Sequence, residues 1–342
     1  MARTSQTSKR NNIQRNILHK KIFLRKSVQR RLVNLFCTYG LYVIFIILLA
    51  YFAIQSKNFL TFSNAINVLR LSSTLGIAVV GMFFVLITAG IDISVSANMY
   101  FSAVVGTTLL NNLGMPLPVC FAGAILSGLL IGAINGYFVA KLKMVPFITT
   151  LATYSVARGL GLMFTNQQML FLDSRAMKFT GVKFLGIPLM VYIFLAVVLI
   201  GHFILTRTQY GRQLFACGNN LTGANKMGIN GTKVIFLAYL ICGALAGLAG
   251  MVNACSLSVI NPNFAIGDEF VVISSAVIGG ASLFGGKGRI LPGAIIGIVM
   301  VQVITNGLTI TGASAYAFTI FRGVIIFIAV MMDSIKFSGE IR

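Results

Sequence analysis

The sequence predicts an all-α polytopic membrane protein with about ten transmembrane helices, and three observations support this fold class. Hydrophobic residues make up 57% of the 342 residues and charged residues only 10%, against about 25% charged residues in an ordinary soluble domain. Apolar stretches of spanning length recur along the chain, and basic residues gather in alternate connections between them. A chain this apolar cannot cover its surface with polar groups in water, whereas a bilayer makes that unnecessary.

Ten stretches are long and apolar enough to serve as spans, because crossing about 30 Å of hydrocarbon takes about 20 helical residues. Gly, Ser and Asp interrupt the third and the eighth stretch, so each of these is either a full span or a broken, re-entrant segment. Together the stretches form one transmembrane domain over residues 35–335. They are residues 35–54, 71–89, 92–110, 117–140, 146–165, 186–205, 233–255, 269–284, 290–310 and 315–332.

The distribution of Lys and Arg predicts that both termini lie in the cytoplasm. Residues 1–34 hold ten basic residues and no acid, and ten crossings then place 20 basic residues inside against five outside, with Arg158 and Arg322 within spans. This bias accounts for the net charge of +21 without a nucleic acid partner. The tail 1–34 is predicted to be a disordered topology anchor or, alternatively, a contact for anionic lipid. Residues 336–342 form a short cytoplasmic tail.

Several kinds of chemistry are excluded by what the sequence lacks. The five Cys show no C-x-x-C or metal-ligand spacing, and two His allow no credible catalytic constellation, so we expect no metal, cofactor or enzymatic site in this chain. The nearest approach to a phosphate-binding loop, residues 279–289, has Ala281 where Gly is needed and Gly288 where Ser or Thr is needed. Acids are sparse within the spans, which argues against an ion-coupled carrier that works alone, the alternative class.

Uncharged polar side chains within the predicted spans are candidates for the path of a neutral polar solute. Amides can exchange hydrogen bonds with such a solute without the cost of a buried charge. Alternatively, each amide bonds two helices together, a contribution often below about 1 kcal/mol in membrane proteins. The path candidates are Asn98, Asn135, Asn253, Gln302 and Asn306.

Small residues four positions apart predict close helix packing, because they let two backbones approach each other in lipid. We interpret these pairs as contacts within the chain, with a dimer face as the alternative. The pairs are Gly128 with Gly132, Gly243 with Gly247, and Gly293 with Gly297.

A weak internal echo is also visible. An Asn-Gly pair at 135–136 is followed by Arg-Gly at 158–159, and the same order returns at 306–307 and 322–323. Many transporters contain an internal duplication, and the echo is compatible with one.

Asp92 stands out because the chain has only six acids and this one follows an apolar stretch directly. Gly90 permits a turn before it. Asp92 can then accept backbone N–H bonds as the N-cap of the next helix, with Ser94 in its first turn. On this interpretation the carboxylate closes a hairpin or a helix break at the inner membrane edge. The alternative is a break inside the membrane beside the translocation path.

The predicted cytoplasmic loop 206–232 contains a short helix or, alternatively, is an ordinary solvated loop. Asn219 or Asn220 can cap this helix, and Ala224 and Met227 lie three positions apart on one face. Gly228 can end it in a left-handed turn. With Gly223, these six residues are the candidates for a contact that couples the spans to another protein.

Four ordered blocks, within residues 55–335, resemble the permease subunits of ribose-type ABC importers of simple sugars. The wider superfamily includes permeases for branched-chain amino acids and nucleosides. The blocks are "VGMFFVLITAGIDISVSA" (80–97), "VPFITTLATYSVARGLGLMFTN" (145–166), "TRTQYGRQLFACGNNLTGANKMGIN" (206–230) and "AVIGGASLFGGKGRILPGAIIGIVMVQVITNGLTITGASAYAFTIFRGVIIFIAVMMD" (276–333).

The resemblance implies the permease fold of ABC importers, a helical bundle of about ten spans in a bacterial plasma membrane. It also implies three partners: a cytoplasmic ABC ATPase that holds ATP-Mg, a second permease copy or relative in a homo- or heterodimer, and an extracytoplasmic solute-binding protein. Loop 206–232 would dock into a cleft on the ATPase.

The chain departs from the family pattern at two positions. Ser96 stands where Gly is usual, and Val271 stands where a second acid is common. The expected cargo is a sugar or sugar-like small solute, with a branched-chain amino acid, a nucleoside or a furanose signal molecule as alternatives.

Overall fold

The computed structural model divides into two compact units. Unit 2 contains residues 52–333, and the rest of the chain is assigned to unit 1. Residue 43 and residues 45–340 are described. Unit 2 holds nearly all of the predicted spans and both candidate sites.

Seven helices among the described residues are long and apolar enough to cross a membrane, which confirms an all-α polytopic membrane protein. A shorter apolar helix covers Phe45–Gln55. The predicted count of about ten spans is not confirmed. The tail 1–34, residues 35–42 and 44 of the predicted span 35–54 and the last two residues lie outside the described residues.

The first half of unit 2 is a run of four helices that alternate in direction. Pro116 immediately precedes α4 and Pro146 is the first residue of α5, where a missing N–H costs nothing. A π-helical turn, η1, continues α4. The elements are α2 (Phe62–Ile87), α3 (Val95–Asn111), α4 (Leu117–Gly136), η1 (Tyr137–Lys141) and α5 (Pro146–Thr165).

The middle of the chain connects the two halves through shorter elements. Asp173 caps α6 by accepting the backbone N–H of Arg175 at 2.9 Å, and this bond lowers the pKa of the Asp173 carboxyl. Strand β1 pairs with β4, and β2 pairs with β3, both antiparallel. The elements are β1 (Leu170–Phe171), α6 (Ser174–Gly181), β2 (Lys183–Phe184), β3 (Ile187–Pro188), α7 (Leu189–Arg207), α8 (Gln209–Asn219) and α9 (Leu221–Lys226).

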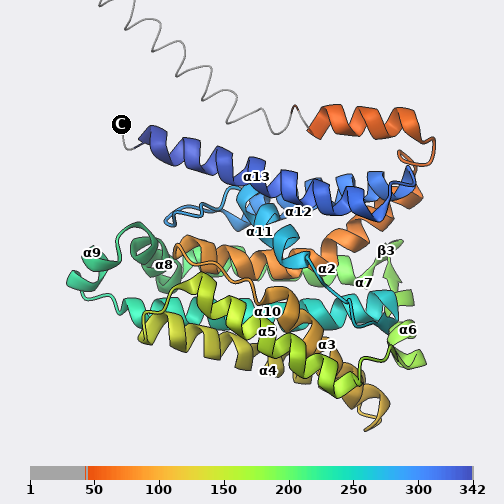
Figure 1. The fold of residues 1–342 in the computed structure, drawn as a ribbon, viewed down its shortest axis with the longest axis horizontal. Helices are drawn as coiled ribbons and strands as arrows, with labels where there is room; N and C mark the ends of the chain where they lie inside the picture. The colour runs from red at the N-terminus through yellow and green to blue at the C-terminus, as the bar shows by residue number, and fades with distance from the viewer. Residues whose placement is uncertain (1–42, 44, 341–342) are drawn as a thin grey trace, which may run out of the picture. The chain divides into compact units, whose positions relative to one another are not determined.

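The second half again contains one short helix among three long ones. Figure 1 shows α8 and α9 at one end of unit 2 and α6 at the other, and these are called the α8–α9 end and the α6 end below. The elements are α10 (Gly231–Leu257), β4 (Val259–Ile260), α11 (Asp268–Ile278), α12 (Ile290–Ile310) and α13 (Ala315–Glu340).

Helices α3 and α11 are short for transmembrane helices. They have 17 and 11 residues, which at 1.5 Å per residue gives about 25 and 16 Å against a hydrocarbon core of about 30 Å. Non-helical chain precedes each of them, over residues 88–94 and 261–267. Neither helix is therefore among the seven candidate spans of the described residues.

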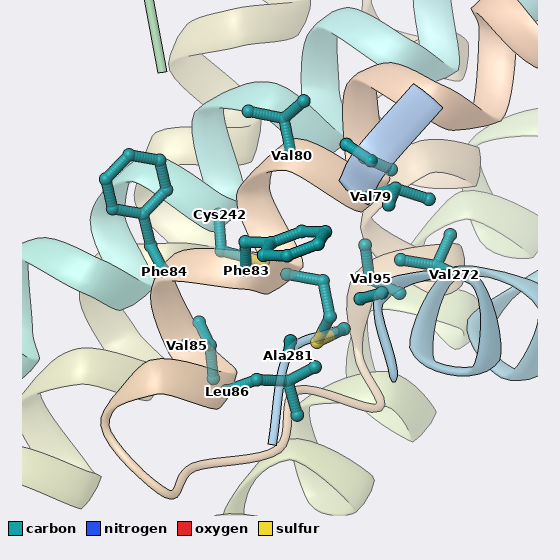
Figure 2. Packing of buried hydrophobic residues seen from close by; sticks show 14 of the residues in the cluster. Val79, Val80, Phe83, Phe84, Val85, Leu86, Val95, Cys242, Val272 and Ala281 are labelled. Carbon is teal, nitrogen blue, oxygen red and sulfur yellow. The ribbon is translucent and has the colours of Figure 1, made fainter. Parts of the chain in front are cut away.

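Helix α2 lies at the centre of unit 2. Its residues from Ser72 to Ile87 are all buried. Figure 2 shows Phe83 and its neighbours on α2 surrounded by Cys242 of α10, Val95 of α3 and Val272 of α11. From Ser72 onward α2 is thus enclosed by protein, and it packs against helices of both halves of unit 2.

Helix α10 packs closely against α4 through glycines. A Cβ at Gly128 would collide with the carbonyl oxygen of Gly243, and a Cβ at Gly247 would collide with that of Ala124. Gly297 of α12 meets the carbonyl of Ser275 on α11 in the same way. The glycine pairs found in the sequence thus form contacts within the chain.

The two halves repeat the same order of elements in opposite directions. Each has a long helix, a break, a short helix, a helix with the Asn-Gly pair and a helix with the Arg-Gly pair. Arg70, near the start of α2, donates through Nε to Oγ of Ser256, near the end of α10, at 3.0 Å. Helices α2 and α10 therefore run antiparallel, as in an inverted repeat.

Candidate functional site

Asp92 is buried in the first break and joins three parts of the chain. Its Oδ1 accepts the N–H of Ser94 at 2.9 Å and the hydroxyl of Ser94 at 2.6 Å. Nδ2 of Asn135 on α4 donates to Oγ of Ser94 at 2.8 Å, and Thr153 on α5 donates to Oδ1 of Asn135 at 2.6 Å. This network ties the break to α4 and α5.

The local geometry differs from the sequence prediction in two details. Helix α3 begins at Val95, so Ser94 occupies the N-cap position, and Asp92 serves the preceding turn by accepting the N–H of Ser94. The positive φ of the turn falls on Ala89, at +60°, and not on Gly90. Gly90 is needed for space, because a Cβ there would lie 2.6 Å from the hydroxyl oxygen of Tyr239.

The five path candidates do not gather in one place. Nδ2 of Asn98 donates to the carbonyls of Gly128 and Gly243, each at 3.3 Å, so Asn98 bonds α3 to α4 and α10. Asn306 accepts a hydrogen bond from Asn64 at 2.9 Å, near the α6 end.

The other three candidates have different surroundings. Asn135 belongs to the Asp92 network, near the α8–α9 end of α4. Gln302 is buried on α12, and Asn253 is partly exposed on α10. Asn98, Asn135 and Asn306 thus have partners on other helices in this conformation, while their part in a path stays a prediction.

The second break contains contacts that the sequence did not reveal. Oε2 of Glu269, in the first turn of α11, accepts the hydroxyl of Ser96, in the first turn of α3, at 2.5 Å. The short helices of the two halves therefore meet at their N-termini. Ser96 is one of the two departures from the family pattern, and here its hydroxyl makes the contact between the halves.

Two arginines hold the chain that leads into α11. Arg158 on α5 donates to the carbonyl of Phe264 at 2.6 Å and also to that of Pro262, with its guanidinium 4.2 Å from the ring centre of Tyr100. Arg322 on α13 donates to the carbonyl of Ile266 at 3.1 Å and pairs with Asp268. The repeated Arg-Gly pair was the only signal of these contacts in the sequence.

The candidate coupling loop folds as two helices. Asn220 caps α9, with its Oδ1 accepting the N–H of Gly223 at 2.8 Å, while Asn219 donates to the carbonyl of Phe215 in α8. Gly228 follows α9 with φ +84°, as predicted for a left-handed end.

Ala224 of α9 and Met227, the residue just after α9, do not share an exposed face. Ala224 is 6% exposed and packs into the core of the chain, whereas Met227 is 84% exposed. Leu221, at the start of α9, is 42% exposed. Met227 and Leu221 are thus available to a partner and Ala224 is not.

The end of α8 touches the chain next to the first break and the connection from α11 to α12. A Cβ at Gly218 would collide with the carbonyl oxygen of Ile87, the last residue of α2. The N–H of Gly286, in the connection from α11 to α12, donates to that same carbonyl at 2.9 Å. Asp333 holds this connection by accepting the N–H of Leu283 at 2.7 Å. We call the contact of Gly218, Ile87 and Gly286 the glycine junction.

A helical bundle with two inverted halves, short helices that meet at their N-termini and an exposed two-helix loop defines the class of membrane transport permeases. Comparison with known proteins makes this specific. Residues 64–330 match the family described as the permease component of branched-chain amino acid transport systems, and the chain belongs to that family.

Several relatives of known description are similar to most of the chain. The ribose import permease protein of Escherichia coli strain K12 is 34% identical over 296 residues, which cover 85% of this chain and 92% of the relative. The D-allose transport system permease protein of the same strain is 35% identical, over 86% of this chain and 91% of the relative. The galactose/methyl galactoside import permease protein of that strain is 30% identical, over 88% of this chain and 95% of the relative. No solved structure matches this chain.

Proposed function

We propose that this chain is the membrane permease subunit of an ATP-driven ABC importer and forms the path of a sugar delivered by an extracytoplasmic binding protein. The observation that carries the proposal is the similarity, over 85% of the chain or more, to permeases named for ribose, D-allose and galactose or methyl galactoside. A second permease copy or relative completes the path. The chain itself belongs to the permease components, and ATP hydrolysis falls to a partner.

The α8–α9 end faces the cytoplasm in this proposal. Lys141, Lys143, Arg207, Arg212 and Lys226 lie at or next to this end, in agreement with the usual excess of basic residues on the cytoplasmic side. The N- and C-termini then lie on the same side. The exposed side chains of Leu221 and Met227 supply an apolar contact for the ATPase, and a Met side chain adapts readily to a partner surface.

The glycine junction transmits the motion of the ATPase to the spans. When α8 and α9 move with the ATPase, Gly218 presses on the carbonyl of Ile87, which is also bonded to Gly286. The backbones are in direct contact, so little movement is lost in flexible side chains. The displacement reaches residues 88–94 before α3 and residues 279–289 after α11, the non-helical segments that can rearrange.

Reconstitution tests the proposal directly. The chain would be placed in liposomes alone, and also with its ATPase and binding protein, and uptake of radiolabelled ribose, D-allose and galactose would be followed. We expect uptake only in the complete system and only with ATP. Uptake by the chain alone would instead establish an ion-coupled carrier. Uptake of leucine or a nucleoside, and of none of the three sugars, would show that the cargo is not a sugar.

A further inference from the structure

A basic pocket opens at the α8–α9 end, between η1 and the start of α10. Its volume is about 390 Å³. Lys141 and Lys233 bring two positive charges to it, and Asn230 and Thr232 bring uncharged hydrogen-bonding groups. Among the described residues that line it, none is acidic. The pocket therefore favours a ligand with negative charge and several hydrogen-bond acceptors.

Two aromatic residues give this pocket an apolar wall. Tyr137 and Phe236 line it, and Nζ of Lys141 lies 5.3 Å from the centre of the Tyr137 ring. Tyr137 begins the π-helical turn η1, and such turns are frequent at functional sites. Tyr side chains are also enriched where a membrane meets water. The pocket thus joins a charged part to an apolar part at the end of a span.

An exposed apolar stripe on α4 leads to the pocket. Leu126, Leu130, Ile134 and Tyr137 are 64%, 60%, 40% and 44% exposed. Spacings of four, four and three residues place them on one helix face. The stripe therefore extends from the middle of α4 into the apolar wall of the pocket.

We propose that this pocket binds the headgroup phosphate of an anionic phospholipid from the cytoplasmic leaflet, with an acyl chain along the α4 stripe. The assignment of the leaflet rests on the proposed function, through the orientation given above. Basic pockets between spans on the cytoplasmic side are suited to such headgroups. The two lysines neutralise the phosphate, Asn230 and Thr232 hydrogen-bond its oxygens or the glycerol, and the stripe excludes water from the chain.

The pocket also adjoins the coupling loop. Asn230 caps α10 by accepting the N–H of Lys233 at 3.0 Å and lies four residues after the end of α9. A bound lipid would therefore fix the start of α10 relative to η1, next to the surface proposed for the ATPase. Contact of the ATPase itself with these lysines is the competing assignment.

Native mass spectrometry of the purified full-length chain tests the site without any transport activity. The protein would be taken from nanodiscs of phosphatidylcholine that contain a minor fraction of phosphatidylglycerol. The test variant is Lys141→Gln with Lys233→Gln, and both side chains are exposed, so folding should persist. The control is Lys143→Gln with Lys226→Gln, which removes the same charge outside the pocket. We expect retained phosphatidylglycerol to fall by about tenfold in the test variant only.

Three results would overturn the proposal. Equal retention of phosphatidylglycerol by the test variant and the wild type would rule out the site. An equal loss of phosphatidylglycerol in the control variant would show a general attraction of the lipid to basic loops. Displacement of the lipid by inorganic phosphate alone would assign the pocket to free phosphate. A fluorophore on Leu142→Cys, next to the pocket, keeps both lysines and should respond to phosphatidylglycerol before the ATPase is added. A response to the ATPase alone would assign the pocket to that partner.

Discussion

Asp92 takes its hydrogen bonds from neutral groups, namely the backbone and hydroxyl of Ser94 and the amide of Asn135. An Asn side chain offers an oxygen in the same place. We therefore expect Asp92→Asn to keep most of the folded protein and most of its transport. Loss of transport by Asp92→Asn at a normal folded yield would give the negative charge a part in the mechanism.

Asp92→Leu should lower the folded amount in the membrane. It leaves the buried N–H and hydroxyl of Ser94 without their acceptor, at a cost of roughly 1–3 kcal/mol for each. Size-exclusion chromatography of a fluorescent fusion gives the monodisperse yield of both variants. A wild-type yield for Asp92→Leu would mean that the Asp92 network contributes little to stability.

Arg158 offers a second test at the scale of single residues. Its guanidinium binds two carbonyls at once, and Lys cannot reproduce this planar geometry. We expect Arg158→Lys to lower the melting temperature and the rate of transport. The cost is roughly 1.5–3 kcal/mol for a bond to a charged group.

Arg322→Lys is the matched control for Arg158→Lys. Its side chain is 34% exposed, so water can replace part of its contacts and the effect should be smaller. A nanodisc melting series would compare the two variants. The reverse order of melting temperatures would mean that Arg158 does not hold the second break.

At the scale of elements, the burial of Ala224 changes the test of the coupling helix. Ala224→Glu would place a charge in the core of the permease, so we expect a reduced yield of the permease itself. Met227→Glu should leave that yield unchanged, because Met227 is 84% exposed. It should instead weaken co-purification of the ATPase and the stimulation of ATP hydrolysis by loaded binding protein.

Met227→Leu controls for this prediction, since it keeps an apolar side chain of similar size. It should retain ATPase binding within about threefold, in keeping with the small cost of volume-conserving substitutions. Wild-type co-purification and stimulation in Met227→Glu would show that α9 is not the docking element.

Long apolar helices were predictable from the sequence, and some of their surroundings were not. The predicted stretches 146–165 and 290–310 have the bounds of α5 and α12. Helix α2 begins at Phe62, whereas the predicted stretch began at residue 71. The prediction missed the first turns of the helix because their polar side chains lower the local hydropathy. Two of these are satisfied within the fold: Asn64 bonds to the carbonyl of Phe59, and Arg70 bonds to Ser256.

The contacts of the candidate site were beyond prediction from this sequence alone. Ser94 and Asn135 are 41 residues apart, and Ser96 and Glu269 are 173 residues apart. No local pattern specifies which polar groups meet across such distances. The residues of the short helix after α8 were predictable because capping and glycine signals are local. The face that it exposes depends on the helices beneath it.

At the scale of the whole molecule, cysteine labelling tests the proposed orientation of the protein in the membrane. Arg289→Cys and Lys178→Cys would be made singly and treated with a membrane-impermeant thiol reagent. Both side chains are exposed. We expect label on Arg289→Cys only from the cytoplasmic side and on Lys178→Cys only from the outside.

The native cysteines allow this test with little change to the protein. Cys120, Cys217, Cys242 and Cys255 are buried and should react slowly, so only Cys37 needs replacement by Ser. The unsubstituted Cys37→Ser protein measures the background. Label from the opposite sides would reverse the proposed topology.

The central place of α2 has a consequence for how the protein is made. Its antiparallel partner α10 leaves the ribosome only after residues 88–230 have been synthesised, which takes roughly ten seconds or more at ordinary rates of elongation. Until then, lipid must surround the face that α10 later covers. The hydroxyls of Ser73 and Thr74 donate to the carbonyls of Leu69 and Leu71 within α2 itself, so these groups are satisfied during the delay. These two hydroxyls of α2 therefore need no partner from α10 while the chain is being made.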